Sequence, residues 1–86
     1  MTDITTETTA TLETWLRNNC KLLYEHRNDP AGFDACEAFI WRIALELSHR
    51  DAGELLATAT EMANRDPIGI HVELREFASE RALVVE

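Results

Sequence analysis

Apolar residues recur at intervals of three and four along most of the chain, with charged residues between them. In the first such stretch, Leu12, Leu16 and Leu23 fall within one arc when the residues are plotted at 100° each, while Glu13 and Arg17 lie outside it. This pattern is typical of an amphipathic helix with one buried face. We therefore expect a helix over residues 8–27.

The stretch from Pro30 to His49 is the most apolar part of the chain, and its main apolar arc is wide enough for a central core helix. A second, narrower apolar row consists of Ala38, Trp41 and Leu45, and it lies more than 90° from the centre of the first arc. A helix with two apolar faces needs two neighbours. The second row is covered either by another helix of the same chain or by a second subunit or a partner protein.

Three acidic positions mark the starts of further helices. Asp29-Pro30 and Asp66-Pro67 place an N-capping carboxylate before a proline, which fits the first helical position because its missing N–H is not needed there. Asp51 precedes Glu54 by three residues, as in a capping box. These signals predict helices over 30–49, 52–65 and 67–82.

The last of these segments fits two structures. Ile68, Ile70, Val72 and Leu74 alternate as in a strand, and residues 82–85 could pair with them. The Asp-Pro start and the long run that follows Leu74 favour a helix instead. A helix completes an all-α protein, whereas the strand reading gives an α+β fold with a C-terminal β-hairpin.

We predict an all-α fold, a small up-and-down bundle of three or four helices. Residues 1–7 form a flexible N-terminus, and residues 8–86 form a single helical domain. A chain of 86 residues buries a modest core, so oligomerisation is a common way for it to gain stability. The predicted core contains Leu16, Leu23, Phe33, Ile40, Ile43, Leu47, Leu55, Met62, Leu74 and Phe77.

Charge narrows the class of partner. Sixteen acidic residues against eight basic ones give a formal net charge of −8. Nucleic-acid binding needs a basic surface that neutralises phosphates, so direct binding of DNA or RNA is disfavoured. A protein partner with a basic surface is the complementary class. An acidic surface also confers solubility, which needs no partner.

The acidic residues differ in their local surroundings. On a helix, Glu73, Glu76 and Glu80 project within about 60° of one another, with no basic residue four positions before or after to balance them. Basic residues follow other acids by four positions, in the pairs Glu13–Arg17, Glu46–Arg50 and Glu61–Arg65. The unbalanced stripe is a candidate surface for Lys or Arg side chains of a partner, or else a short solvated face.

No motif for catalysis, metal binding or a cofactor is found, so we predict none of the three. The chain has no CxxC, HxxxH or HExxH spacing and no glycine-rich phosphate loop. Cys20 and Cys36 lie at similar distances from the first turn, where packed free thiols are the expected state in a reducing compartment. The sequence shows neither a signal peptide nor a membrane span, which indicates a cytoplasmic location.

The leading functional hypothesis is a non-enzymatic interaction module that acts as an adaptor or inhibitor, with homodimerisation expected. As a class, phage-encoded anti-defence (anti-CRISPR-like) proteins and other nucleic-acid mimics share this small size and negative charge, and they block basic grooves. The alternative is a structural homodimerisation module, with a small-ligand carrier or an enzyme less favoured. The candidate partner-binding residues are Glu73, Glu76, Glu80, Trp41, Leu45 and Ala38.

Overall fold

The computed structural model describes residues 3–62 and 69–84. A short 3₁₀ helix, η1 (Ile4–Thr6), precedes α1 (Thr9–Glu25), α2 (Pro30–Met62) and α3 (Ile70–Val84). The prediction of an all-α fold is confirmed. Within the described ranges there is no strand, and residues 70–84 are helical, so the alternative with a C-terminal β-hairpin is not supported.

The helix predicted to begin after Asp51 is continuous with the one before it. Asp51 has the extended angles φ −161° and ψ 97° inside α2, so it divides the helix into two halves at a kink. The Asp51 Oδ1 atom accepts a hydrogen bond of 3.2 Å from the Glu54 backbone N–H, as an N-capping carboxylate does. The described residues therefore contain three α-helices, and the predicted capping residue Asp51 kinks the second one, so that no loop separates its two parts.

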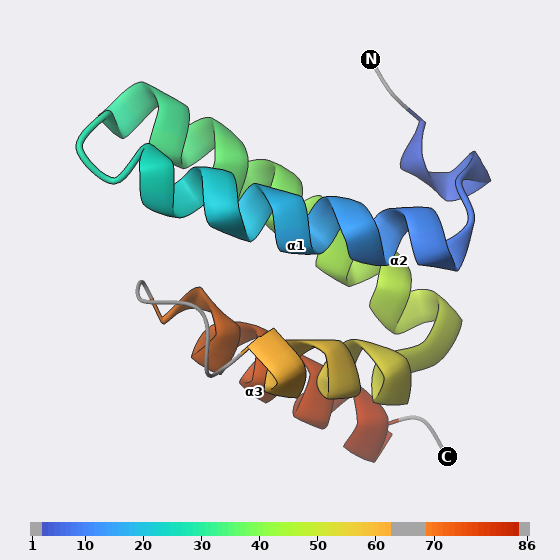
Figure 1. The fold of residues 1–86 in the computed structure, drawn as a ribbon. Helices are drawn as coiled ribbons and strands as arrows, with labels where there is room; N and C mark the ends of the chain where they lie inside the picture. Colours follow the sequence, from blue (N-terminus) through green and yellow to red (C-terminus); the bar gives the residue numbers. More distant parts are fainter. Residues whose placement is uncertain (1–2, 63–68, 85–86) are drawn as a thin grey trace.

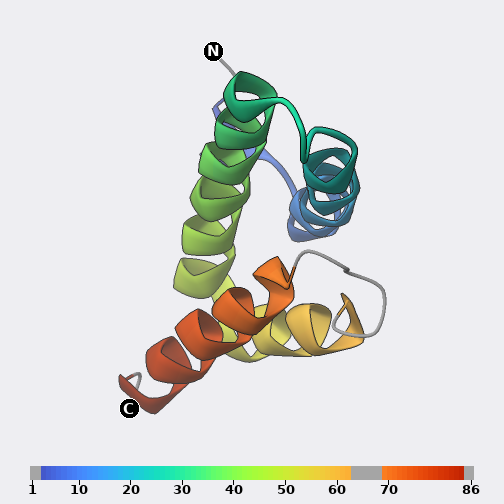
Figure 2. The same ribbon diagram turned by 90° about the vertical axis from the view of Figure 1, so that its left-hand side faces the viewer.

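The kink arranges the molecule in two layers (Figures 1 and 2). In the first layer, α1 lies antiparallel to the first half of α2 (residues 30–50). In the second layer, α3 lies beside the second half of α2 (residues 52–62), which runs in a different direction from the first (Figure 2). Helices α1 and α3 each pack chiefly against α2, so α2 forms one wall of both layers.

The core consists mainly of aliphatic side chains from all three helices. Leu12 and Leu16 of α1, Ile43 of α2 and Leu74 of α3 are completely buried. Eight of the ten predicted core residues are buried; the exceptions are Phe33 and Phe77, which are half-buried and pack on the margin of the core. Two aromatic rings are thus left at the rim, where they contact both the core and the surface.

The start of α3 depends on a glycine. Gly69 precedes the helix with φ +85°, a left-handed conformation that costs little only for glycine, and its carbonyl accepts from the Val72 N–H. Helix α3 begins at Ile70 and ends at Val84, whereas the sequence pattern predicts 67–82. The Asp66-Pro67 signal itself lies outside the described residues.

The segment before α1 is joined to α2 by one arginine. The Arg50 guanidinium donates to the backbone carbonyls of Ile4, Thr5 and Glu7, while its Nε donates to Glu46 at 2.8 Å. The side chain of Ile4 is buried in the core. Part of the predicted flexible N-terminus, residues 1–7, therefore lies against α2 in this structure.

Candidate functional site: a groove between α2 and α3

An open groove of about 630 Å³ runs between the second half of α2 and α3. It is lined by Leu56 and Thr60 from α2 and by Val72, Arg75, Glu76, Ser79 and Glu80 from α3. The lining includes two of the three glutamates of the predicted acidic stripe. The groove is the place where the candidate residues of α3 meet a second element of the fold.

One wall of the groove is a single ridge of α3. Val72, Glu76 and Glu80 follow one another at four-residue intervals, so they stand on one side of the helix over about 12 Å. Val72 is 46% exposed, and both glutamates are exposed. The ridge therefore changes along its length from an apolar side chain to two carboxylates.

The opposite wall is less polar. Leu56 is half-buried against the core, and the Thr60 hydroxyl donates to the Leu56 carbonyl at 2.8 Å, which uses its only donor inside the helix. Leu56 and Thr60 are also four residues apart and stand on one side of α2. The groove offers apolar surface on this wall and charge on the other.

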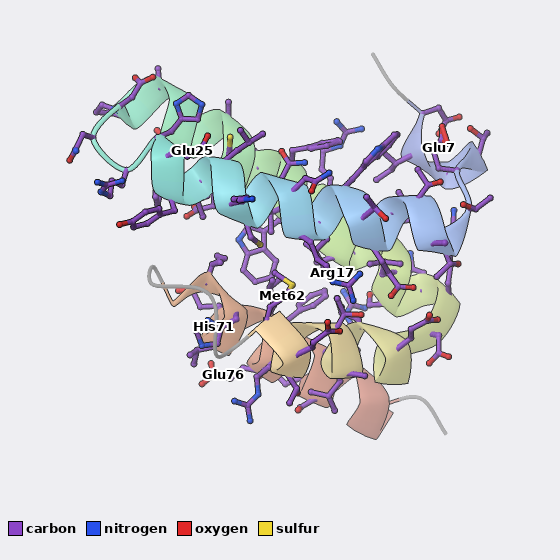
Figure 3. The ribbon with its side chains drawn as sticks, in the orientation of Figure 1. Glu7, Arg17, Glu25, Met62, His71 and Glu76 are labelled. Carbon is purple, nitrogen blue, oxygen red and sulfur yellow. The ribbon has the colours of Figure 1, made fainter. Side chains whose placement is uncertain are left out.

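The acidic stripe forms no ion pair within the described residues. Glu73, Glu76 and Glu80 form no ion pair or hydrogen bond with any other residue that the structure describes. Glu76 points outward from α3 (Figure 3). Arg75, which lines the same groove, and Arg81 are the two basic residues of α3, so the three glutamates leave this helix a formal net charge of −1 with His71 neutral. These carboxylates are free to meet cations that come from another molecule.

The second apolar row of α2 is only partly covered by the chain itself. The ring of Trp41 meets the ring of Phe77 on α3 edge to face, with centroids 5.5 Å apart, and the Arg81 guanidinium lies 5.0 Å from the Phe77 centroid. Trp41 is half-buried by this contact. Of the two explanations for the row, a helix of the same chain accounts for Trp41.

Leu45 and Ala38 differ from Trp41. Leu45 is 41% exposed, and Ala38 is also exposed. Neither lines the groove, so the six candidate residues form two groups. Glu73, Glu76 and Glu80 lie on α3, and Ala38, Trp41 and Leu45 lie on the first half of α2. The structure does not bring these groups together into one site.

The ion pairs differ from those expected at four-residue spacing. Glu46 and Arg50 pair as expected. The expected Glu13–Arg17 pair is wrong: Arg17 instead reaches Glu61 on the second half of α2 at 2.9 Å, and it points from α1 toward that helix in Figure 3. This contact between layers was not predictable from local spacing. The third expected pair involves Arg65, which lies outside the described residues.

Glu13 has a different neighbour because Arg17 turns away from it. The Thr58 hydroxyl donates to Glu13 Oε2 at 3.2 Å, and the Glu13 carboxyl lies beside that of Glu54. A hydrogen bond with Glu13 and the repulsion between the two carboxylates raise the pKa of Glu54 above its usual value of 4.5, with a smaller contribution from Asp51. An acidic contact thus joins α1 to the second half of α2.

Other candidate chemistry is sparse. Cys20 is buried and Cys36 is half-buried, and both are thiols in the structure. Across residues 3–62 and 69–84, no group of three or more His, Cys, Asp or Glu side chains is arranged to hold a metal ion. No helix in those same ranges combines the length and hydropathy needed to cross a membrane.

Comparison of the chain with known protein families, with curated proteins and with solved structures finds no match.

Glu76 and Glu80 of the acidic wall were predicted from the sequence as candidate residues, whereas Leu56 and Thr60 of the other wall were not. Leu56 is an ordinary core-facing residue in its own helix, and Thr60 carries no signal at all. Their position beside α3 depends on the kink at Asp51 and on how α3 returns along the second half of α2. The clustering of Glu73, Glu76 and Glu80 on one side of a helix was the local signal of this surface.

Proposed function

We propose that this protein is an acidic interaction module that binds a basic, nucleic-acid-binding protein and acts as its adaptor or inhibitor. The observation that carries the proposal is the line of exposed glutamates on α3, which form no ion pair with any described residue and border an open groove. A net charge of −8 attracts a basic surface at long range, while the groove supplies a place for contact.

The inhibitor role follows from charge. A protein that binds phosphates uses clustered Lys and Arg, and the α3 face offers carboxylates to the same side chains. Binding there would compete with nucleic acid for the basic surface. The proposal places no catalytic step, cofactor or metal in the protein.

The test is capture of a partner from a host-cell lysate by the immobilised protein at low and high salt. The matched variants are Glu73→Gln/Glu76→Gln/Glu80→Gln and a control, Glu25→Gln/Asp34→Asn/Glu37→Gln, which removes three charges near the other end of the molecule. We expect salt and added DNA to release the captured basic proteins. The α3 variant should fail to capture them, whereas the control variant should capture them as the wild type does. Capture that resists salt and DNA, or that both variants lose equally, would contradict the proposal.

A homodimerisation module is the second candidate, and the exposure of Leu45 and Ala38 on one side of α2 favours it. Because Leu45 lies outside the core, Leu45→Glu should leave the melting temperature nearly unchanged while it converts a dimer to a monomer in sedimentation. A monomeric wild-type protein, or a dimer that survives Leu45→Glu, argues against this surface as the interface.

A further inference from the structure

The groove between α2 and α3 has a shape and a charge pattern that select one kind of occupant. Its exposed walls consist of helix side chains, and in the described residues no strand edge offers free backbone groups to an extended peptide. Recognition here must therefore use side chains. A helix laid along the groove is the segment that presents side chains at matching four-residue intervals.

The order of side chains along the ridge sets the order on the occupant. The exposed Val72 offers apolar contact, and Glu76 and Glu80 follow it one and two turns further along α3, where Arg75 also lines the groove. A helix that matches this pattern carries one large apolar residue followed by two basic residues, each four positions from the last. The helix can run parallel or antiparallel to α3.

A second copy of this chain does not supply that segment. Arg17 and Lys21 are the one pair of basic residues spaced four apart in the sequence, and they are flanked at the same spacing by Glu13 and Glu25. Arg17 is also bonded to Glu61. Two copies with a net charge of −8 each repel one another as well.

We propose that the groove binds an amphipathic basic helix of the partner protein, with an apolar side chain against Val72 and Lys or Arg side chains against Glu76 and Glu80. This inference rests on the proposed function and adds where the basic partner binds and what it presents. The apolar contact fixes the position of the helix, and the two charge pairs fix its register.

The probe is a capped 16-residue helical peptide on an Ala/Gln background, with Leu at one position and Lys four and eight positions later. A control peptide has the same composition but carries the Leu on the opposite face. Backbone amide shifts of the ¹⁵N-labelled full chain show where each peptide binds, and the titration gives its Kd.

Shifts from the patterned peptide should concentrate at residues 56, 60 and 72–80. Val72→Ser removes the exposed apolar contact without touching the core, and Glu76→Gln/Glu80→Gln removes the two charges; each change should weaken binding by about three- to tenfold. Glu25→Gln/Asp34→Asn, in which Glu25 lies well apart from Glu76 (Figure 3), should change it by less than about twofold.

The outcomes separate this inference from the function on which it rests. Shifts centred elsewhere, or equal Kd values for the two peptides, overturn the helix-in-groove assignment and leave an acidic module that binds basic partners. Absence of peptide binding, together with salt-sensitive capture that depends on the α3 glutamates, overturns the assignment in the same way. Absence of both overturns the assignment and the proposed function together.

Discussion

The two layers of the molecule use their charged side chains in opposite ways. In the layer of α1 and the first half of α2, Arg50 joins the N-terminal segment to Glu46, and Arg17 reaches across to Glu61. In the other layer, Glu76 and Glu80 of α3 have no partner within the described chain. Arg17, Arg50 and their partners thus hold the fold, whereas Glu76 and Glu80 remain available for binding.

The largest effects are expected in the core. Leu16 and Leu74 are both 0% exposed, one in each layer, and replacing either by Ala should lower the free energy of unfolding by about 2–5 kcal/mol. Because α2 is a wall of both layers, each variant should unfold in one transition. Urea titrations followed by circular dichroism and by tryptophan fluorescence should coincide. Two separated transitions would show that the layers unfold independently.

The next largest effect is expected at Arg50. Arg50→Leu removes the hydrogen bonds to three backbone carbonyls and to Glu46, and it should lower the free energy of unfolding by about 2–3 kcal/mol. Hydrogen exchange at the amides of Thr6 and Glu7 should speed up at the same time. Arg75→Leu is the matched control, because Arg75 is exposed and should change stability by less than about 0.5 kcal/mol.

A smaller, pH-dependent effect is expected where the layers meet at Glu13 and Glu54. The raised pKa of Glu54 means that the folded protein holds this proton more tightly than the unfolded chain. Stability from this pair is therefore present at low pH and is lost as the pH rises from 4.5 through the raised pKa. Glu54→Gln should raise the melting temperature at pH 7. It should also reduce the decrease in melting temperature that the wild type shows as the pH rises above 4.5. An unchanged pH profile would contradict the contact.

The smallest effect is expected on the binding face. Glu76 and Glu80 are like charges four residues apart on α3, so Glu80→Gln should increase the free energy of unfolding by about 0.2–0.5 kcal/mol. The same change should weaken the binding of a basic partner. A loss of stability in thermal or urea unfolding would instead give this glutamate a role in holding the fold.

Local patterns in the sequence predicted the helices well. The apolar arcs identified most of the core, and Asp51 was identified as a capping residue. These features depend on residues within a few positions of one another, where periodicity and capping preferences act. The coverage of Trp41 by Phe77 stayed one of two alternatives, because either a helix of the same chain or a partner satisfies the same apolar row.

Contacts between distant segments were not predictable in this way. The pairing of Arg17 with Glu61 and of Arg50 with the carbonyls of residues 4, 5 and 7 depends on the path of α2 after its kink. Long side chains of opposite charge have several possible partners at similar energy, and tertiary packing selects among them. The Leu56 wall of the groove was missed for the same reason.

The extended conformation of Asp51 makes one residue the joint between the two layers. Within the described residues the backbone passes from the first layer to the second at that point, so changing its angles would turn the second half of α2 and α3, with the glutamate ridge, relative to α1 and would break the Arg17–Glu61 contact. A protein engineer who wishes to re-aim this binding face toward a different target therefore has a single hinge to redesign, with the chemistry of the face itself left intact.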